Sequence, residues 1–95
     1  MHESGLTRAL VREIVRAAAR EGATKVVRAK VRIGALAGIS PDHLREHFII
    51  AARGSVAEDA SLEVEMAAED QEPHANGILL ETLEFASASS ELAKI

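Results

Sequence analysis

The sequence predicts an α+β fold in which two helices pack on one face of a three-stranded mixed sheet. Two segments carry apolar residues at helical spacing and three carry them at alternate positions, in the order helix, strand, helix, strand, strand. A chain of 95 residues is the size of one domain with a small hydrophobic core. We therefore expect one folded domain over residues 1–86, followed by a tail over residues 87–95.

The first helix is expected over residues 4–21, with Ser4 as its N-cap and Gly22 as its stop. Its buried stripe should consist of Leu6, Leu10, Val11, Ile14, Val15 and Ala18. A second stripe at the same spacing is basic and consists of Arg8, Arg12, Arg16 and Arg20. That stripe fits either a solvated helix face, which is the commoner case, or a surface for an acidic partner.

Two strands with complementary charges are expected over residues 25–33 and 61–66. The outer face of the first is basic and that of the second is acidic, so the two strands should lie side by side. This pairing accounts for the charge asymmetry of the chain. Residues 1–53 hold ten Lys or Arg against five Asp or Glu, a charge of +5, and residues 54–95 hold one against ten, a charge of −9. The side chains expected to face the core are Val27, Ala29, Val31 and Ile33, with Val26 outside, and then Leu62, Val64 and Met66.

The second helix should begin at Ser40-Pro41, because serine is a good N-cap and proline suits the first helical position. Its buried stripe should consist of Leu44, Phe48 and Ala51, and Gly54 should end it. A polar loop over residues 67–77 then leads to a third strand over residues 78–86.

The third strand has a fault in its alternation. Ile78 and Leu80 share one phase, whereas Leu83 and Phe85 share the other. A one-residue bulge near Glu81-Thr82 would bring all four side chains to the same face. In the tail that follows, residues 91–94 are compatible with a short helix.

Composition excludes several classes of function. The chain has no cysteine, so it can form neither disulfides nor thiolate zinc sites, and its only aromatic residues are two phenylalanines, too few for a nucleic-acid stacking platform. No apolar run approaches the roughly 20 residues that span a bilayer, and the start of the chain does not read as a signal peptide. No catalytic motif is present. We expect a cytoplasmic protein that is not an enzyme and binds neither membranes nor nucleic acid.

The strongest candidate for metal chemistry is His2. A terminal amine, the backbone amides that follow it and an imidazole at the second residue can surround one metal with nitrogens, an arrangement that suits square-planar Ni(II) or Cu(II). An exposed histidine without a role is the commoner case at such a position. His43 and His47 could also clamp a metal from one helix face, although a half-buried structural role is the commoner one for His47.

The order of several motifs carries more information than any one of them. The chain opens with Met1-His2-Glu3 directly before an amphipathic helix, and the first strand ends in Val31-Arg32-Ile33-Gly34. The segments Leu36-Ala37-Gly38-Ile39-Ser40-Pro41 and Ala60-Ser61-Leu62-Glu63-Val64 follow. Over nearly all of residues 1–66, the sequence resembles the HypA/HybF hydrogenase nickel-incorporation family, and residues 77–85 look like the closing strand of that family.

The resemblance implies a nickel metallochaperone. Such a protein accepts Ni(II) and passes it to the precursor of the large subunit of nickel–iron hydrogenase, together with the GTPase HypB. The family holds nickel at its Met-His-Glu start, which corresponds here to Met1, His2 and Glu3. Asp42 is a further candidate, by its proximity to that site. Residues 1–86 are thus expected to form the nickel-binding domain.

The sequence departs from this family at one place. The family inserts a zinc ribbon with two pairs of cysteines before its last long strand, whereas the corresponding loop here, residues 67–77, has none. We therefore expect no structural zinc, whether the loss is natural or engineered. The alternative function is a metal-free interaction or assembly module on the same fold.

Overall fold

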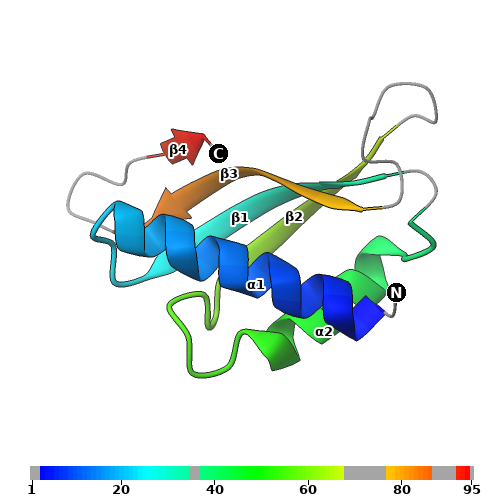
Figure 1. The fold of residues 1–95 in the computed structure, drawn as a ribbon, viewed down its shortest axis with the longest axis horizontal. Coiled ribbons are helices and arrows are strands. Elements are labelled where there is room, and N and C mark those ends of the chain that lie inside the picture. The colour runs from blue at the N-terminus through cyan, green and yellow to red at the C-terminus, as the bar shows by residue number, and fades with distance from the viewer. Residues whose placement is uncertain (1–2, 35–36, 68–76, 87–91, 95) are drawn as a thin grey trace.

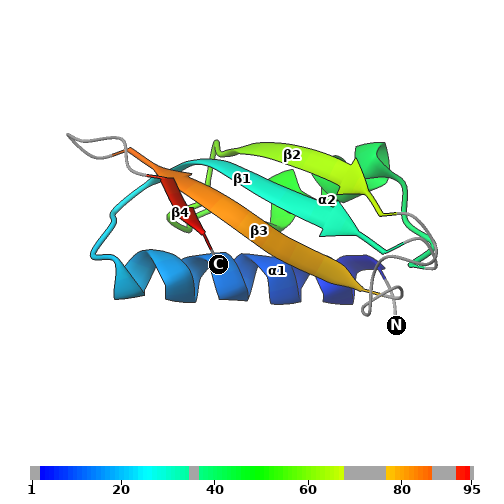
Figure 2. The same cartoon turned by 90° about the horizontal axis from the view of Figure 1, so that it is seen from above.

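The computed structural model describes residues 3–34, 37–67, 77–86 and 92–94 (Figure 1). Over these residues, α1 (Glu3–Arg20) and α2 (Pro41–Ala51) lie on the same face of a sheet, as the two views in Figures 1 and 2 show. No helix in the described ranges is long and apolar enough to cross a membrane. The expected α+β class and the expected order of elements are confirmed.

The sheet is mixed and contains β1 (Val26–Ile33), β2 (Ser61–Met66), β3 (Ile78–Phe85) and a short β4 (Leu92–Lys94). Its strand order is β2-β1-β3-β4. β1 pairs with β2 in parallel and with β3 antiparallel, so β1 and β2 lie side by side as expected. A parallel pair needs a crossover connection, and α2 supplies it.

The fourth strand corrects one expectation about the tail. Residues 92–94 form β4, which pairs antiparallel with β3, instead of a short helix over residues 91–94. Leucine, alanine and lysine are good helix formers, but backbone pairing with an open sheet edge outweighs so weak a local preference.

Helix α1 buries Leu10, Val11, Ile14, Ala17 and Ala18 against the sheet and α2. It begins at Glu3, so Ser4 lies inside the helix and the expectation of an N-cap at Ser4 is wrong. Val15 is 36% exposed and lies outside the buried stripe. Gly22 has a φ of +66°, a left-handed conformation that glycine adopts without strain, and it follows the helix as expected.

Helix α2 begins as the sequence predicts. The Oγ of Ser40 accepts a hydrogen bond from the backbone N–H of His43 at 3.1 Å, and Pro41 is the first helical residue. Leu44 and Phe48 are buried. The helix ends at Ala51, earlier than the expected stop at Gly54.

The irregular third strand contains the predicted bulge. Leu80 pairs with Val31 and Thr82 pairs with Lys30, which leaves Glu81 between them without a partner in the register. The extra residue brings Leu80 and Leu83 to the same face, where both are buried.

A second irregularity, in β1, was not predicted. The register shifts between Val26 and Arg28, so Val27 is the extra residue. Val26 is consequently buried and Val27 is 37% exposed, the reverse of what strict alternation predicts. The expected inward position of Met66 is also wrong, because this last residue of the edge strand β2 is 51% exposed.

Charged pairs connect the outer faces of the three long strands. Each of two β1 arginines contacts a glutamate of β2 and a glutamate of β3, which confirms the expected cross-strand charge pairing. Arg28 lies 3.1 Å from Glu63 and 3.3 Å from Glu84, and Arg32 lies 3.5 Å from Glu65 and 2.9 Å from Glu81. These pairs lie at the surface, with Glu81 and Glu84 half-buried, and each contributes about 1 kcal/mol or less, so they fix the register more than they stabilise the fold.

Candidate metal site

The residues expected to bind nickel belong to the starts of two helices. Glu3 is the first residue of α1 and Asp42 is the second residue of α2. Both views show the two helices beginning at the same end of the molecule (Figures 1 and 2). Met1 and His2 lie outside the described residues, as does the side chain of Glu3.

The start of α1 has properties that suit a backbone-nitrogen site. The first four N–H groups of an α-helix have no partner within the helix, and that of Glu3 is the first of them. A nitrogen at this position can therefore bind a metal without breaking a hydrogen bond of the helix. The positive end of the helix dipole also favours the loss of protons from nearby amines and amides.

Asp42 does not belong to a cluster of metal-binding side chains among the described residues. Its side chain is 93% exposed, and its Oδ1 lies 3.3 Å from Nη1 of Arg45. Arg45 also donates a hydrogen bond from Nε to the carbonyl oxygen of Leu62 at 3.1 Å, so its guanidinium is anchored to β2. Within the described ranges, no group of three or more His, Cys, Asp or Glu side chains is placed to hold a metal.

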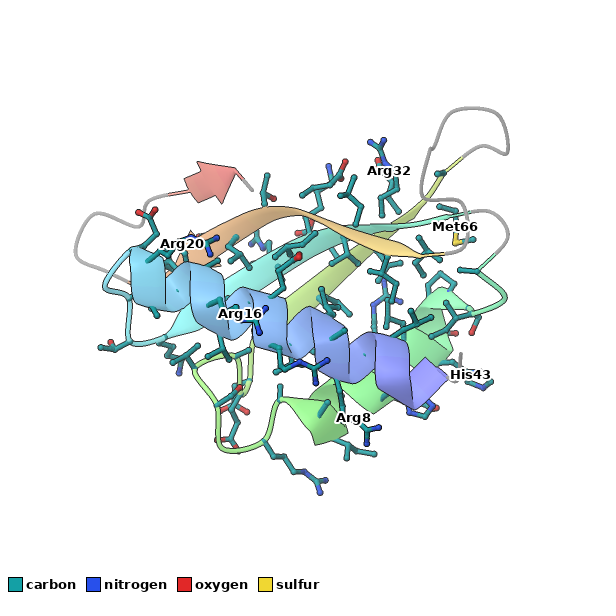
Figure 3. The ribbon with its side chains drawn as sticks, viewed as in Figure 1. Arg8, Arg16, Arg20, Arg32, His43 and Met66 are labelled. Carbon is teal, nitrogen blue, oxygen red and sulfur yellow. The ribbon has the colours of Figure 1, made fainter. Side chains whose placement is uncertain are left out.

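His43 lies near the end of the molecule where both helices begin (Figure 3). From the sequence, it was considered as a metal ligand only as a pair with His47. It is exposed in the first turn of α2, and Figure 3 shows it beside the end of the molecule where α1 begins. The signal in the sequence was its position directly after Asp42, at the helix start. His47 is half-buried and lines the same hollow as Thr7 of α1, which confirms its expected position at the border of the buried stripe.

The strand ends beside this region are joined by backbone hydrogen bonds. The N–H of Ala67 donates to the carbonyl of Ile33 at 2.9 Å, and the N–H of Gly34 donates to the carbonyl of Gly77 at 2.9 Å. Ala67 and Gly77, the two ends of the expected polar loop, are therefore both attached to the end of β1. The rest of that loop lies outside the described residues. A connection between fixed, neighbouring ends can change length at a small entropic cost, so an insertion here would be compatible with the sheet.

Comparison with known proteins identifies relatives along most of the chain. A family model described as hydrogenase/urease nickel incorporation, metallochaperone, hypA matches residues 1–74. The hydrogenase maturation factor HypA of Archaeoglobus fulgidus is 36% identical over 70 residues, which are 74% of this chain and 64% of that protein. The protein of the same name from Chlorobium limicola is 42% identical over 65 residues, 68% of this chain and 56% of that protein. The chain thus matches less than two thirds of the length of either relative.

Solved structures show the same fold. The solution structure of the Ni metallochaperone HypA from Helicobacter pylori matches with a TM-score of 0.77 and 18% sequence identity, covering 90% of this chain and 97% of that one. A second solution structure of a HypA protein matches with a TM-score of 0.68 and 20% identity, covering 90% and 96%. At these identities, the likeness concerns the fold alone.

Proposed function

Because this chain belongs to the HypA family of hydrogenase and urease nickel-incorporation metallochaperones, we propose that it binds Ni(II) as cargo at its N-terminus and delivers it during maturation of nickel–iron hydrogenase. The observation that supports this proposal most directly is the start of α1 at Glu3, immediately after His2. Met1 and His2 come directly before Glu3 in the sequence, so these three residues carry the amine, the amides and the imidazole that the site needs.

The proposed ligands are nitrogens from three consecutive residues. The terminal amine of Met1, the imidazole of His2 and the backbone amides of His2 and Glu3 can form a plane of closely spaced nitrogens around Ni(II), which accepts square-planar geometry. Asp42 is proposed as an additional oxygen ligand. Its exposed ion pair with Arg45 is of the weak kind, so exchanging that partner for a metal costs little.

Delivery requires partners, and the family supplies the candidates. We propose a HypB-like GTPase and the precursor of the hydrogenase large subunit as the proteins that exchange nickel with this chain. We propose no catalytic role for the chain itself, because its function is transfer of an ion. We also propose that it carries no structural zinc, since it has no cysteine to bind one.

A calorimetric titration with Ni(II) tests the proposal. The protein must begin at Met1, and we expect about one nickel per chain, because the proposed nitrogens form one plane. The variant His2→Ala should lose this binding, whereas the matched controls His43→Ala and His47→Ala should retain it. If the His2→Ala variant binds nickel as well as the parent protein does, the proposed site is wrong.

A metal-free interaction module is the second candidate function. The arginines of α1 favour it, since they are exposed and form no ion pair with any described residue. The same titration separates the two functions, because a metal-free module would show no stoichiometric nickel binding even with an intact Met1.

A further inference from the structure

A row of arginines on α1 has no electrostatic partner in the described part of the chain. All four side chains are exposed, and Figure 3 shows three of them spread along the length of the helix. The arginines of β1 and α2, in contrast, each contact a carboxylate. We call the α1 residues the arginine row, and they are Arg8, Arg12, Arg16 and Arg20.

The spacing of the arginine row works against the stability of the isolated helix. Like charges four residues apart on a helix face each other and repel. A glutamate in place of Arg12 or Arg16 would replace two repulsive contacts by attractive ones. A glutamate in place of Arg8 or Arg20 would replace one. The row forms no ion pair within the described fold, apart from the favourable position of Arg20 in the last turn of the helix, and is available to a negatively charged partner.

Exposed apolar side chains lie next to one end of this row. Ile49 and Ile50 of α2 are 62% and 60% exposed, more than any other large hydrophobic side chain of the described residues. Ile50 lines a hollow of about 120 Å³ between the two helices, together with Thr7, Arg8, His47 and Ala51. The first member of the arginine row thus borders a largely apolar depression.

The other exposed isoleucine has a similar neighbour. Ile49 and Arg53 both line a groove of about 370 Å³ between α2 and the turn that precedes β2. Arg53 is exposed and has no carboxylate partner among the described residues. The isoleucine pair therefore has Arg8 beside Ile50, whereas the groove beside Ile49 is mixed in charge, because the exposed Glu58 and Asp59 line it together with Arg53.

We infer that the arginine row and the Ile49–Ile50 pair form a docking surface for an acidic segment of a partner protein that carries an aliphatic anchor. Carboxylates of the segment would contact the row, and the anchor would enter the hollow beside Ile50. The row extends from Arg8 to Arg20, a rise of about 18 Å along the helix, so the segment should present its carboxylates over a similar length. This inference does not depend on nickel binding.

The same features disfavour a nucleic acid as the occupant. Phosphates would satisfy the arginines but would leave the two isoleucines without an apolar partner. Neither phenylalanine can stack on a base, since Phe48 is 2% exposed and Phe85 is 4% exposed. An acidic protein segment provides both kinds of contact.

Fluorescence anisotropy with a synthetic peptide tests the inference. The probe is a labelled helical peptide with glutamates at every fourth position and one leucine on the edge of that face. A second peptide has serine in place of the leucine. We expect the leucine peptide to bind several-fold more tightly than the serine peptide. Its affinity should fall about tenfold or more between low and high salt, because salt screens exposed charge pairs.

Matched variants of the protein locate the binding surface. Arg8→Glu and Arg12→Glu should each lower the affinity for the leucine peptide by about fivefold, as expected for an exposed charge pair. Lys25→Glu makes the same change of charge at an exposed position outside the row and should have little effect. Ile50→Ser should also weaken binding, whereas Met66→Ser, at a similarly exposed apolar residue on β2, should not. Circular dichroism establishes that each variant remains folded.

Several results would overturn the inference. Equal affinity for the leucine and serine peptides would show that no apolar anchor contributes to binding. Equal losses of affinity from Arg12→Glu and Lys25→Glu would show that the arginine row has no special role. Tighter binding of duplex DNA or of anionic vesicles than of the peptide would assign the surface to another class of partner, and a dimer that Ile50→Ser dissociates would assign it to a second copy. His2→Ala should bind the peptide as the parent protein does, so failure of this inference is distinguishable from failure of the nickel site.

Discussion

At the scale of single residues, Glu3 determines which backbone groups are available before the first helix. Glu3 is the first described residue of α1, so its N–H is among the first N–H groups of the helix, which have no intrahelical partner. The position of the helix start and the proposed chemistry are therefore consistent with each other.

Acid should release nickel from the proposed site. An imidazole and a terminal amine must be unprotonated to bind a metal, and their reference pKa values are about 6.5 and about 7.7–8.0. Protons compete more strongly as the pH falls through these values, and nickel itself competes for the same groups, so release should occur over roughly pH 5–7. Equilibrium dialysis at a series of pH values measures this. Full retention of nickel at pH 4 would contradict it.

A comparison of two isoleucines tests which side chains stabilise the fold. Ile14 of α1 is 0% exposed, so Ile14→Ala should lower the free energy of unfolding by about 2–5 kcal/mol through lost burial and a cavity. Ile49 of α2 is 62% exposed, so the matched change Ile49→Ala should alter it by no more than about 0.5 kcal/mol. Urea denaturation gives both values. Similar losses for the two variants would show that the assignment of the core is wrong.

Burial could be predicted from the sequence for most individual residues, and the failures have a physical cause. The buried positions of Leu10, Ile14 and Leu44 follow from helical spacing. Val26 and Val27 are exchanged, because a bulge changes the phase of a strand and neither valine differs from its neighbour in polarity. A bulge can be recognised in the sequence only where polar residues show which positions of the strand face outward.

At the scale of elements, the bulge at Glu81 shows how one residue sets the faces of a strand. Its presence was predictable, because the apolar residues on its two sides have opposite phases. Its side chain also has a function in the sheet, since Glu81 lies 2.9 Å from Arg32. The extra residue thus aligns the core side of β3 and contributes a charge to the outer side.

Deleting Glu81 should damage the fold far more than replacing it. The deletion moves half of the strand to the wrong face, which exposes either Leu80 or Leu83 together with its apolar neighbour, at a cost of about 3 kcal/mol or more. Glu81→Ala keeps the bulge and loses one ion pair in which Glu81 is half-buried, a change of about 1 kcal/mol. Thermal melts of both variants measure the difference. A deletion variant as stable as Glu81→Ala would contradict the assigned register.

The elements that the sequence did not predict are those with weak local signals. The three-residue strand β4 is too short for alternation to appear, and its residues favour helices when isolated. Only the open edge of β3 explains it, and an edge is a property of the assembled sheet. The long helices and strands, in contrast, each contain several turns or alternations and were predicted within a few residues.

At the scale of the whole molecule, the helix starts and the two ends of the expected polar loop lie at the same end of the fold (Figures 1 and 2). Ala67 and Gly77 are hydrogen-bonded to Ile33, the last residue of β1, and to Gly34, which follows it, so the ends of this connection are joined at this end of the sheet. The fold of the described residues consequently has a core of its own between the helices and the sheet. The site residues from separate elements could be predicted only through the family resemblance, because no spacing in the sequence relates Glu3 to Asp42.

Stability without metal is expected from this core. Purified protein should contain far less than one zinc per chain, and EDTA should leave its melting temperature unchanged, because the buried side chains form one hydrophobic cluster without a metal ligand set in the described residues. Elemental analysis and thermal melts with and without EDTA measure this. A marked fall in melting temperature in EDTA would reveal a structural metal.

A comparison of nickel affinity with and without a native N-terminus is the decisive test of the backbone-nitrogen site. Two proteins are titrated with Ni(II) under identical conditions, one beginning at Met1 and one with a few residues added before it. The extension removes the terminal amine of Met1 and keeps His2, so we expect an affinity lower by roughly tenfold or more, about 1.4 kcal/mol, with an unchanged melting temperature. Equal affinity of the two proteins would show that the amine is not a ligand and would contradict the backbone-nitrogen site.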